Sequence, residues 1–187
     1  MRITPPFRHP GSPLRPRAHR AGQSVVEFAL VLPVLMIMLV AVGDFGRLYV
    51  SAVAVESAAR EAADFGAFRS VNWMPANVTV TTDLMQRRAC VAAAGSHLEG
   101  YAGAADGSSC TNPSFTCNLE WGGSSVDCAS SGGFVGATDC ATETTDPPCI
   151  VHVRLDYDFD MILSFPGLPD TVALARESRF RMQDLTP

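Results

Sequence analysis

A twenty-residue apolar run, from Ser24 to Gly43, is the feature that most constrains this chain of 187 residues. It holds one charged side chain, Glu27, and at about 1.5 Å per helical residue it crosses a hydrocarbon layer of about 30 Å. Residues 1–22 carry five arginines and no acid, and Asp44 follows the run. By the positive-inside rule, we expect a single-pass helix in the inner (plasma) membrane, with a cytoplasmic N-terminus and a periplasmic or extracellular C-terminal part.

The charge pattern excludes several classes of function. The chain contains no lysine, which rules out a Walker A phosphate site, a lysine Schiff base and a Ser-x-x-Lys acylation site. From residue 28 onward, nine arginines accompany eighteen acidic residues. Because a phosphate backbone requires a basic surface, we expect no nucleic acid partner.

Six cysteines lie in the exported part, most of them in a segment rich in Gly, Ser, Thr and Ala. They are Cys90, Cys110, Cys117, Cys128, Cys140 and Cys149. An even number in such a segment predicts up to three disulfides formed in an oxidising compartment, although six cysteines allow fifteen pairings. A disulfide at Cys90 would connect this segment to the preceding helix.

A secretory signal peptide is the alternative interpretation of the N-terminus. Small residues at Ala41 and Gly43 offer signal peptidase a site before Asp44. The long basic region and the position of Glu27 oppose this interpretation, because a carboxylate at mid-membrane costs about 2.5–3.5 kcal/mol. Such a carboxylate requires a partner or a proton.

Cleavage after Gly22 would supply that partner, because the new α-amino group of Gln23 would lie one helical turn from Glu27 or be offered by a neighbouring subunit. The residues Gly22-Gln23-Ser24-Val25-Val26-Glu27-Phe28 resemble the processing site of type IV prepilins. In those proteins a membrane aspartyl peptidase cuts after the glycine, and a Glu is the fifth mature residue. The resemblance implies that Gly22 and Gln23 flank the scissile bond and that Glu27 pairs with a mature amino terminus.

Residues 21–68 also resemble the TadE-like family of minor pseudopilins, which belong to the Tad (Flp, type IVb) pilus machinery. The resemblance rests on Asp44-Phe45-Gly46-Arg47, then Ala58-Ala59-Arg60-Glu61-Ala62-Ala63, and Gly66. It implies a non-catalytic, membrane-anchored component of pilus assembly, without a cofactor. The implied partners are prepilin peptidase, other Tad pilus components and pseudopilins. The alternative is a membrane-tethered or secreted periplasmic binding module whose Cys-rich lobe binds the ligand.

The helix is expected to continue beyond the membrane. Apolar or small residues recur three and four apart at Phe45, Leu48, Ala52, Val55, Ala59, Ala62 and Gly66. This face is interpreted mainly as the core side of the exported domain, and secondarily as a subunit contact. Asn77 to Thr81 alternate as a strand candidate, and Asp83 with Gln86 suggests a capping box for a helix from Leu84 to about Ala94.

Two strands are predicted near the C-terminus. From Ile150 to Met161 apolar and polar residues alternate, and Thr171 to Met182 offers a returning strand with Val172, Leu174 and Phe180 inward. The turn formers of Gly100 to Pro148 indicate an irregular lobe. Its aromatic residues, Phe115, Trp121 and Phe134, are interpreted as a small core in preference to a contact surface.

The fold class expected is α+β, with a long transmembrane and amphipathic helix packed on a small antiparallel sheet and a disulfide-rich irregular lobe. The expected segments are a basic leader (1–22), a transmembrane helix (23–43), an exported helical part (44–99), a Cys-rich loop lobe (100–149) and a C-terminal strand pair (150–187).

No catalytic or metal site is predicted. Asp156, Asp158 and Asp160 resemble the start of a calcium loop, but Met161 occupies the position where an EF-hand requires glycine. No His-Glu-x-x-His, Gly-x-Ser-x-Gly or Cys-x-x-Cys pattern occurs. We therefore expect the chain not to be an enzyme.

Overall fold

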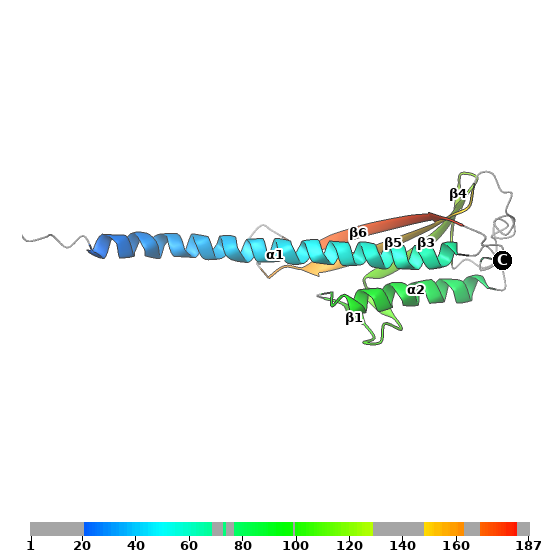
Figure 1. Cartoon of the computed structure of the whole chain (residues 1–187), viewed down its shortest axis with the longest axis horizontal. Coiled ribbons are helices and arrows are strands. Elements are labelled where there is room, and N and C mark those ends of the chain that lie inside the picture. Colours follow the sequence, from blue (N-terminus) through cyan, green and yellow to red (C-terminus); the bar gives the residue numbers. More distant parts are fainter. Residues whose placement is uncertain are drawn as a thin grey trace, which may run out of the picture. The chain divides into compact units, whose positions relative to one another are not determined.

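The computed structural model describes residues 21–68, 73, 77–98, 100–128, 148–162 and 169–182. The helices are α1 (Ala21–Ala67) and α2 (Val78–Gly95) (Figure 1). The strands are β1 (Ala102–Gly103), β2 (Cys110–Asn112), β3 (Ser114–Trp121), β4 (Ser124–Asp127), β5 (Ile150–Asp160) and β6 (Thr171–Arg181). The predicted α+β class and the long N-terminal helix are confirmed. The chain divides into two compact units between Leu39 and Val40.

The first unit consists, in its described part, of the apolar portion of α1. Every residue from Gly22 to Leu39 is exposed, including the large apolar side chains. The core helix of a soluble protein would bury such side chains, and this stretch buries none of them. In the described part of the chain, α1 is the helix that has the length and composition to cross a membrane. These properties suit a single-pass anchor.

The second unit places α1 and α2 on one face of a four-stranded antiparallel sheet ordered β4-β3-β5-β6. The residues that α1 buries against the sheet are mostly alanine, and Ala58, Ala59, Ala62 and Ala63 are fully buried. Such short side chains allow the helix backbone to approach the sheet closely. The interpretation of this helix face as the core side of the domain is confirmed, except that Phe45 is 72% exposed.

The C-terminal strand pair has the predicted register of inward and outward residues. The inward side chains of β5 are all buried: Val151, Val153, Leu155, Tyr157 and Phe159. Strand β6 pairs with β5 along its full length, from Ile150 opposite Arg181 to Asp160 opposite Thr171. Leu174 and Phe180 of β6 pack against the core, as predicted.

The interpretation of residues 102–127 as part of an irregular lobe is wrong, because this segment forms β1 to β4. Strand β3 lies between β4 and β5, so it is a central strand of the main sheet. Its inward residues include Cys117 and Leu119, which are buried opposite Val153 and Val151. The strand signal in the sequence was weak because Phe115, Leu119 and Trp121 are the only strongly apolar residues that alternate with the polar Thr116, Asn118 and Glu120.

The strand predicted from Asn77 to Thr81 is also wrong, because α2 begins at Val78. Asp83 lies inside this helix, so the predicted capping box does not exist, and Asn77 is the N-cap residue without a side-chain cap. The buried residues Thr81, Met85, Ala89 and Ala93 recur every four positions. Burial of this helical face outweighs the strand preference of the β-branched residues at its start.

A small hairpin formed by β1 and β2 rests on α2 through Gly107. Gly107 is buried at φ +70°, and a Cβ atom there would lie 2.5 Å from the Cα atom of Val91. We expect Gly107→Ala to lower the free energy of unfolding by about 1–3 kcal/mol. Gly122→Ala is the matched control, because Gly122 also has a positive φ but nothing within 4 Å. Equal urea midpoints for the two variants would contradict the close packing of the hairpin.

Candidate functional site

The proposed processing segment lies in the first turns of α1. Gly22, Gln23 and Glu27 are all exposed. The side-chain amide of Gln23 donates a hydrogen bond to Glu27 Oε1 at 3.3 Å. The bond between Gly22 and Gln23 lies within the first helical turn, where the backbone N–H groups have no partners inside the helix. A terminal turn of this kind unwinds at a lower cost than the middle of the helix.

The second sequence motif, Asp44-Phe45-Gly46-Arg47, forms a polar contact between α1 and the end of β5. Asp44 is only 4% exposed, and Arg47 Nη1 donates to its Oδ1 at 2.7 Å. The backbone N–H of Ile162 donates to the same oxygen at 3.3 Å. Asp44 therefore joins two segments that are 118 residues apart in the sequence. No sequence pattern pointed to this pairing.

The neighbouring side chains complete this contact. The Arg47 guanidinium lies over the ring of Phe159, at 5.2 Å from its centroid, a geometry that favours a cation–π interaction. Tyr157 is buried, and burial raises the pKa of its hydroxyl, opposed by a hydrogen bond with Ser51. Its hydroxyl therefore stays neutral at physiological pH. These groups fix the orientation of the exported part of α1 over the sheet.

The third motif, from Ala58 to Ala63, alternates between core and surface. Its alanines are buried, whereas Arg60 pairs with Glu56 and Glu61 accepts a hydrogen bond from Arg88 of α2 at 3.2 Å. The Arg88 guanidinium also lies 4.4 Å from the ring centroid of Phe65. The motif therefore serves two contacts, one with the sheet and one with α2.

Two disulfides connect the elements of the second unit. Cys90 of α2 is bonded to Cys110 of β2, and Cys117 of β3 is bonded to Cys128. Cys149 is also disulfide-bonded, and Cys140 lies outside the described residues. The Cys90–Cys110 bond attaches the hairpin to the helical layer.

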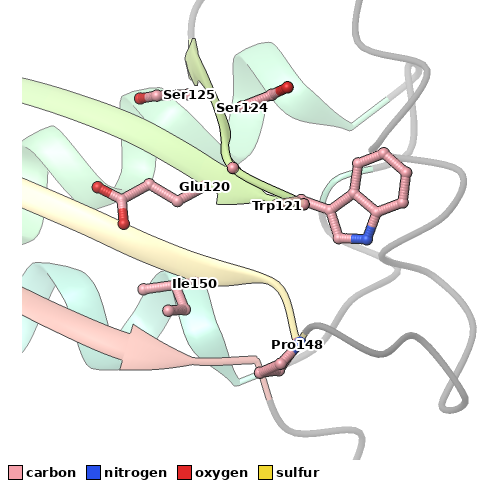
Figure 2. A pocket seen from close by; sticks show the side chains of 8 residues that line it. Glu120, Trp121, Ser124, Ser125, Pro148 and Ile150 are labelled. Atoms are coloured by element: carbon pink, nitrogen blue, oxygen red, sulfur yellow. The ribbon is translucent and has the colours of Figure 1, made fainter.

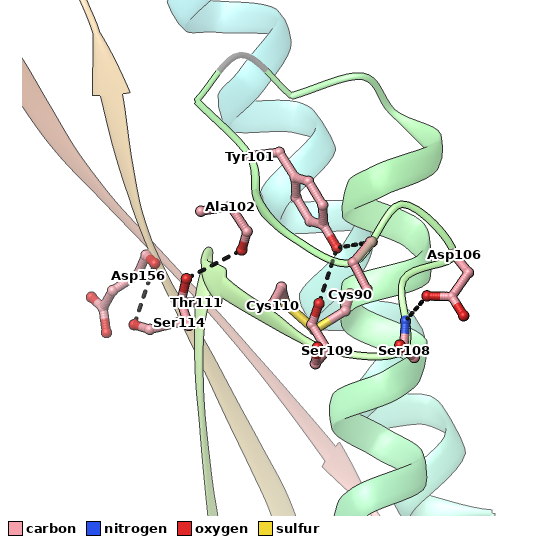
Figure 3. Close-up of a disulfide and its surroundings, with 11 residues drawn as sticks. Cys90, Tyr101, Ala102, Asp106, Ser108, Ser109, Cys110, Thr111, Ser114 and Asp156 are labelled. Carbon is pink, nitrogen blue, oxygen red and sulfur yellow. Dashed lines mark hydrogen bonds between the residues drawn. A yellow bond between two sulfur atoms is a disulfide. The ribbon is translucent and has the colours of Figure 1, made fainter.

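Figure 3 shows the hydrogen bonds around the Cys90–Cys110 disulfide. The Tyr101 hydroxyl donates to Ala104 O at 3.1 Å, and the backbone N–H of Ser108 donates to Asp106 Oδ1 at 3.0 Å. The latter bond lowers the pKa of Asp106. The hairpin is thus held by local hydrogen bonds and by one covalent bond to α2.

Replacing Cys90 and Cys110 by serine should destabilise the second unit. The bond joins residues 20 positions apart, and closing a loop of that size in the unfolded chain corresponds to about 3 kcal/mol. Urea unfolding of the variant measures this loss, and hydrogen exchange should show reduced protection across β1 and β2. An unchanged urea midpoint together with unchanged exchange would contradict a stabilising role for the bond.

The outer face of the sheet carries a network of charged side chains. His152 Nδ1 lies 3.0 Å from Glu120, and its Nε2 lies 3.3 Å from Glu177. Arg154 contacts both Glu177 and Asp156. The pairs with Glu120 and Glu177 connect β5 to its two neighbouring strands, and the Arg154–Asp156 pair lies within β5. A solvent-facing sheet surface accounts for all of them. Among the described residues, no group of three or more His, Cys, Asp or Glu side chains is arranged to hold a metal ion.

A shallow hollow of about 350 Å³ lies at the turn between β3 and β4 (Figure 2). Its lining includes Glu120, Trp121, Ser124 and Ser125, with Pro148 and Ile150 from the neighbouring chain segment. Trp121 is partly buried here, and Phe115 packs against the core of the main sheet, not in a separate core of the lobe. Phe134 lies outside the described residues. Glu120 is engaged by His152 and Arg179.

Comparison with known families identifies the N-terminal part of the chain. A family model described as TadE-like protein matches residues 22–64. The chain is TadE-like over these residues. The match spans the Gly22–Glu27 segment, the apolar run and the two motifs of the exported helix described above, and it ends at Asp64. No curated protein and no solved structure matches the chain.

The match to the TadE-like family over residues 22–64 suggests a component of the Tad pilus system. Asp44, Arg47 and the buried alanines of this segment make the contacts that hold the helix on the sheet. The tertiary role of Asp44 was not predicted from the sequence.

Proposed function

We propose that this chain is a minor pseudopilin, a non-catalytic component that enters, initiates or supports assembly of a Tad-type pilus. The observation that carries the proposal is the TadE-like match over residues 22–64, which contains both a prepilin-like cleavage motif and a membrane-length apolar helix. In this arrangement the helix is anchored in the inner membrane, the leader 1–22 faces the cytoplasm, and the second unit is exported.

Prepilin peptidase is the proposed processing enzyme, with the scissile bond between Gly22 and Gln23. Glu27 lies one turn away from Gln23 in α1, where the two side chains already form a hydrogen bond. After cleavage, the α-amino group of Gln23 supplies a positive charge about one helical turn from Glu27. A carboxylate within a membrane requires such a partner, so the mature amino terminus of this subunit or of a neighbour pairs with Glu27.

The second unit serves as the part that contacts other pilus components. Its core is fixed by α1 and by disulfides, and its outer sheet face is covered with charged residues. A domain that contains disulfides is suited to an oxidising compartment. The proposed segments are a transmembrane helix (23–43), an exported helical part (44–99), a Cys-rich segment (100–149) that contains β1 to β4 in place of the expected loop lobe, and the C-terminal strands (150–187).

Deletion of this chain in its native cell tests the proposal. We expect the amount of sheared surface Tad pilus, measured by immunoblot of the major pilin, to fall at least tenfold and to return on complementation. The total cellular major pilin should stay unchanged, which separates an assembly defect from reduced synthesis. Normal surface piliation in the deletion strain would contradict the proposed function.

A further inference from the structure

One end of the second unit presents an exposed apolar surface, here called the base surface. On α1 it consists of Val42, Phe45 and Tyr49, which are 73%, 72% and 67% exposed. Their spacing of three and four residues places them on one face of the helix. Ile162, which follows β5, is also 62% exposed and lies at the same level of α1, on the side of the helix that faces the sheet. Large apolar side chains at such exposure indicate a contact that the isolated chain does not supply.

Ile162 belongs to this surface although it is distant in the sequence. Its backbone N–H donates to Asp44 Oδ1, which fixes Ile162 beside the turn of α1 that carries Phe45. The N–H of Met161 donates to Asp170 O at 3.0 Å, so the chain around Ile162 is also tied to the start of β6. The end of β5 is therefore held at the same level as the first turns of the exported helix.

Two charged groups at this end, Asp44 and Arg47, are directed inward, whereas Asp160 and Asp170 are exposed close to Ile162. Asp44 is almost fully buried, and Arg47 forms an ion pair with it while its guanidinium lies over Phe159. The carboxylate is thus satisfied by Arg47 and by a backbone N–H within the protein. The charge of Asp44 is therefore compensated inside the protein, and the apolar residues of the base surface are bordered by the exposed carboxylates of Asp160 and Asp170.

The base surface lies at the end of the membrane-spanning run of α1, so the membrane interface is the medium next to it. Gly43 ends the run that fills a hydrocarbon layer, and the headgroup region adds roughly 5–7 Å on each side. At about 1.5 Å per residue, Phe45 lies about 3 Å beyond Gly43, within this region, and Tyr49 lies about 9 Å beyond it, just past its outer edge. Trp and Tyr are enriched at membrane interfaces because their rings are amphipathic.

We propose that the base surface, formed by Val42, Phe45, Tyr49 and Ile162, contacts the lipid interface of the membrane. This inference rests on the membrane anchor of the proposed function. Ile162 is then a second membrane contact of the exported domain, separate from the helix, and Asp44 holds it there. The domain is seated on the bilayer at the end where β5 finishes and β6 begins.

The test is tryptophan fluorescence of the full chain in phosphatidylcholine and phosphatidylglycerol vesicles with brominated acyl chains. Ile162→Trp and Phe45→Trp report on the base surface, and Leu39→Trp reports on the anchor. Val80→Trp is the matched control, because Val80 is 60% exposed on α2. The Thr82 hydroxyl, two residues after Val80, donates a hydrogen bond to the carbonyl oxygen of Cys128. The N–H of Cys128 donates to the carbonyl oxygen of Cys117, which lies opposite Val153 of β5. Val153 is roughly 30 Å from Ile162 along β5, so Val80 lies near the opposite end of the sheet. The unsubstituted chain gives the background from Trp73 and Trp121.

We expect brominated lipid to quench the added signal of Trp in place of Ile162 or Phe45 by at least half of the loss seen at position 39. The Val80→Trp protein should match the background. Quenching at position 39 with background behaviour at position 162 would overturn the base surface and leave the anchor intact. No quenching at position 39 would overturn both the anchor and this inference.

Discussion

Replacing Glu27 by leucine is expected to leave the chain stably inserted in the membrane and to reduce surface piliation at least tenfold. The substitution removes a carboxylate whose insertion in a membrane costs about 2.5–3.5 kcal/mol at mid-helix. Membrane insertion of the variant should therefore be at least as stable as that of the wild type. The partner charge on a mature amino terminus is then left without its counter-ion. Fractionation measures insertion, and immunoblot of sheared pili measures assembly.

Two further variants separate charge from shape in this experiment. Glu27→Gln keeps the length of the side chain and should show the same assembly defect, because only the charge is lost. Val26→Leu changes a neighbouring exposed apolar residue and should assemble normally. Wild-type piliation by both Glu27 variants would contradict the proposed role of this carboxylate and favour a tethered binding module.

Replacing Trp73 by alanine is expected to lower the free energy of unfolding of the second unit by about 3–5 kcal/mol. Trp73 is fully buried, and its Nε1 donates to Gly66 O at 2.8 Å near the C-terminal end of α1. The substitution leaves a large cavity and removes the partner of a buried carbonyl. Because domains are typically stable by about 5–15 kcal/mol, such a loss is a large fraction of the total.

Trp121→Ala is the matched control for this substitution. Trp121 is partly exposed at the hollow beside β4, so the same change of residue removes less buried area. Urea unfolding followed by far-ultraviolet circular dichroism gives both values without relying on tryptophan emission. Equal losses for Trp73→Ala and Trp121→Ala would show that Trp73 is not the main anchor of the helical layer.

Periodic segments of the chain could be predicted from the sequence. The alternation from Ile150 to Met161 gave the inward residues of β5, and the three-and-four spacing from Leu48 to Gly66 gave the core face of α1. In both segments the burial pattern repeats over many residues. The local periodicity and the long-range packing therefore favour the same secondary structure.

Segments whose local preference competes with packing were mispredicted. The β-branched residues after Asn77 favour a strand, but Thr81 and Met85 are buried on one helical face, so α2 begins at Val78. Strand β3 has few apolar residues, and its pairing with β5 supplies the hydrogen bonds that define it. Such pairing between distant segments leaves no local signal.

The candidate site was likewise only partly predictable. The Gly22–Glu27 motif is local, so the sequence could suggest it without a structure. The bond from Ile162 to Asp44 spans 118 positions, and neither residue is unusual in its own neighbourhood. The base surface therefore became visible only after the fold had brought the end of β5 to the start of the exported helix.

The mature N-terminus, determined by mass spectrometry of protein recovered from native membranes, tests the central claim most directly. We predict Gln23 as the first residue, because cleavage after Gly22 produces the amino group that pairs with Glu27. An intact Met1 would contradict prepilin-type processing and leave a plain signal anchor. A chain that begins at Asp44 would contradict the membrane anchor as well, and would make this a secreted periplasmic domain.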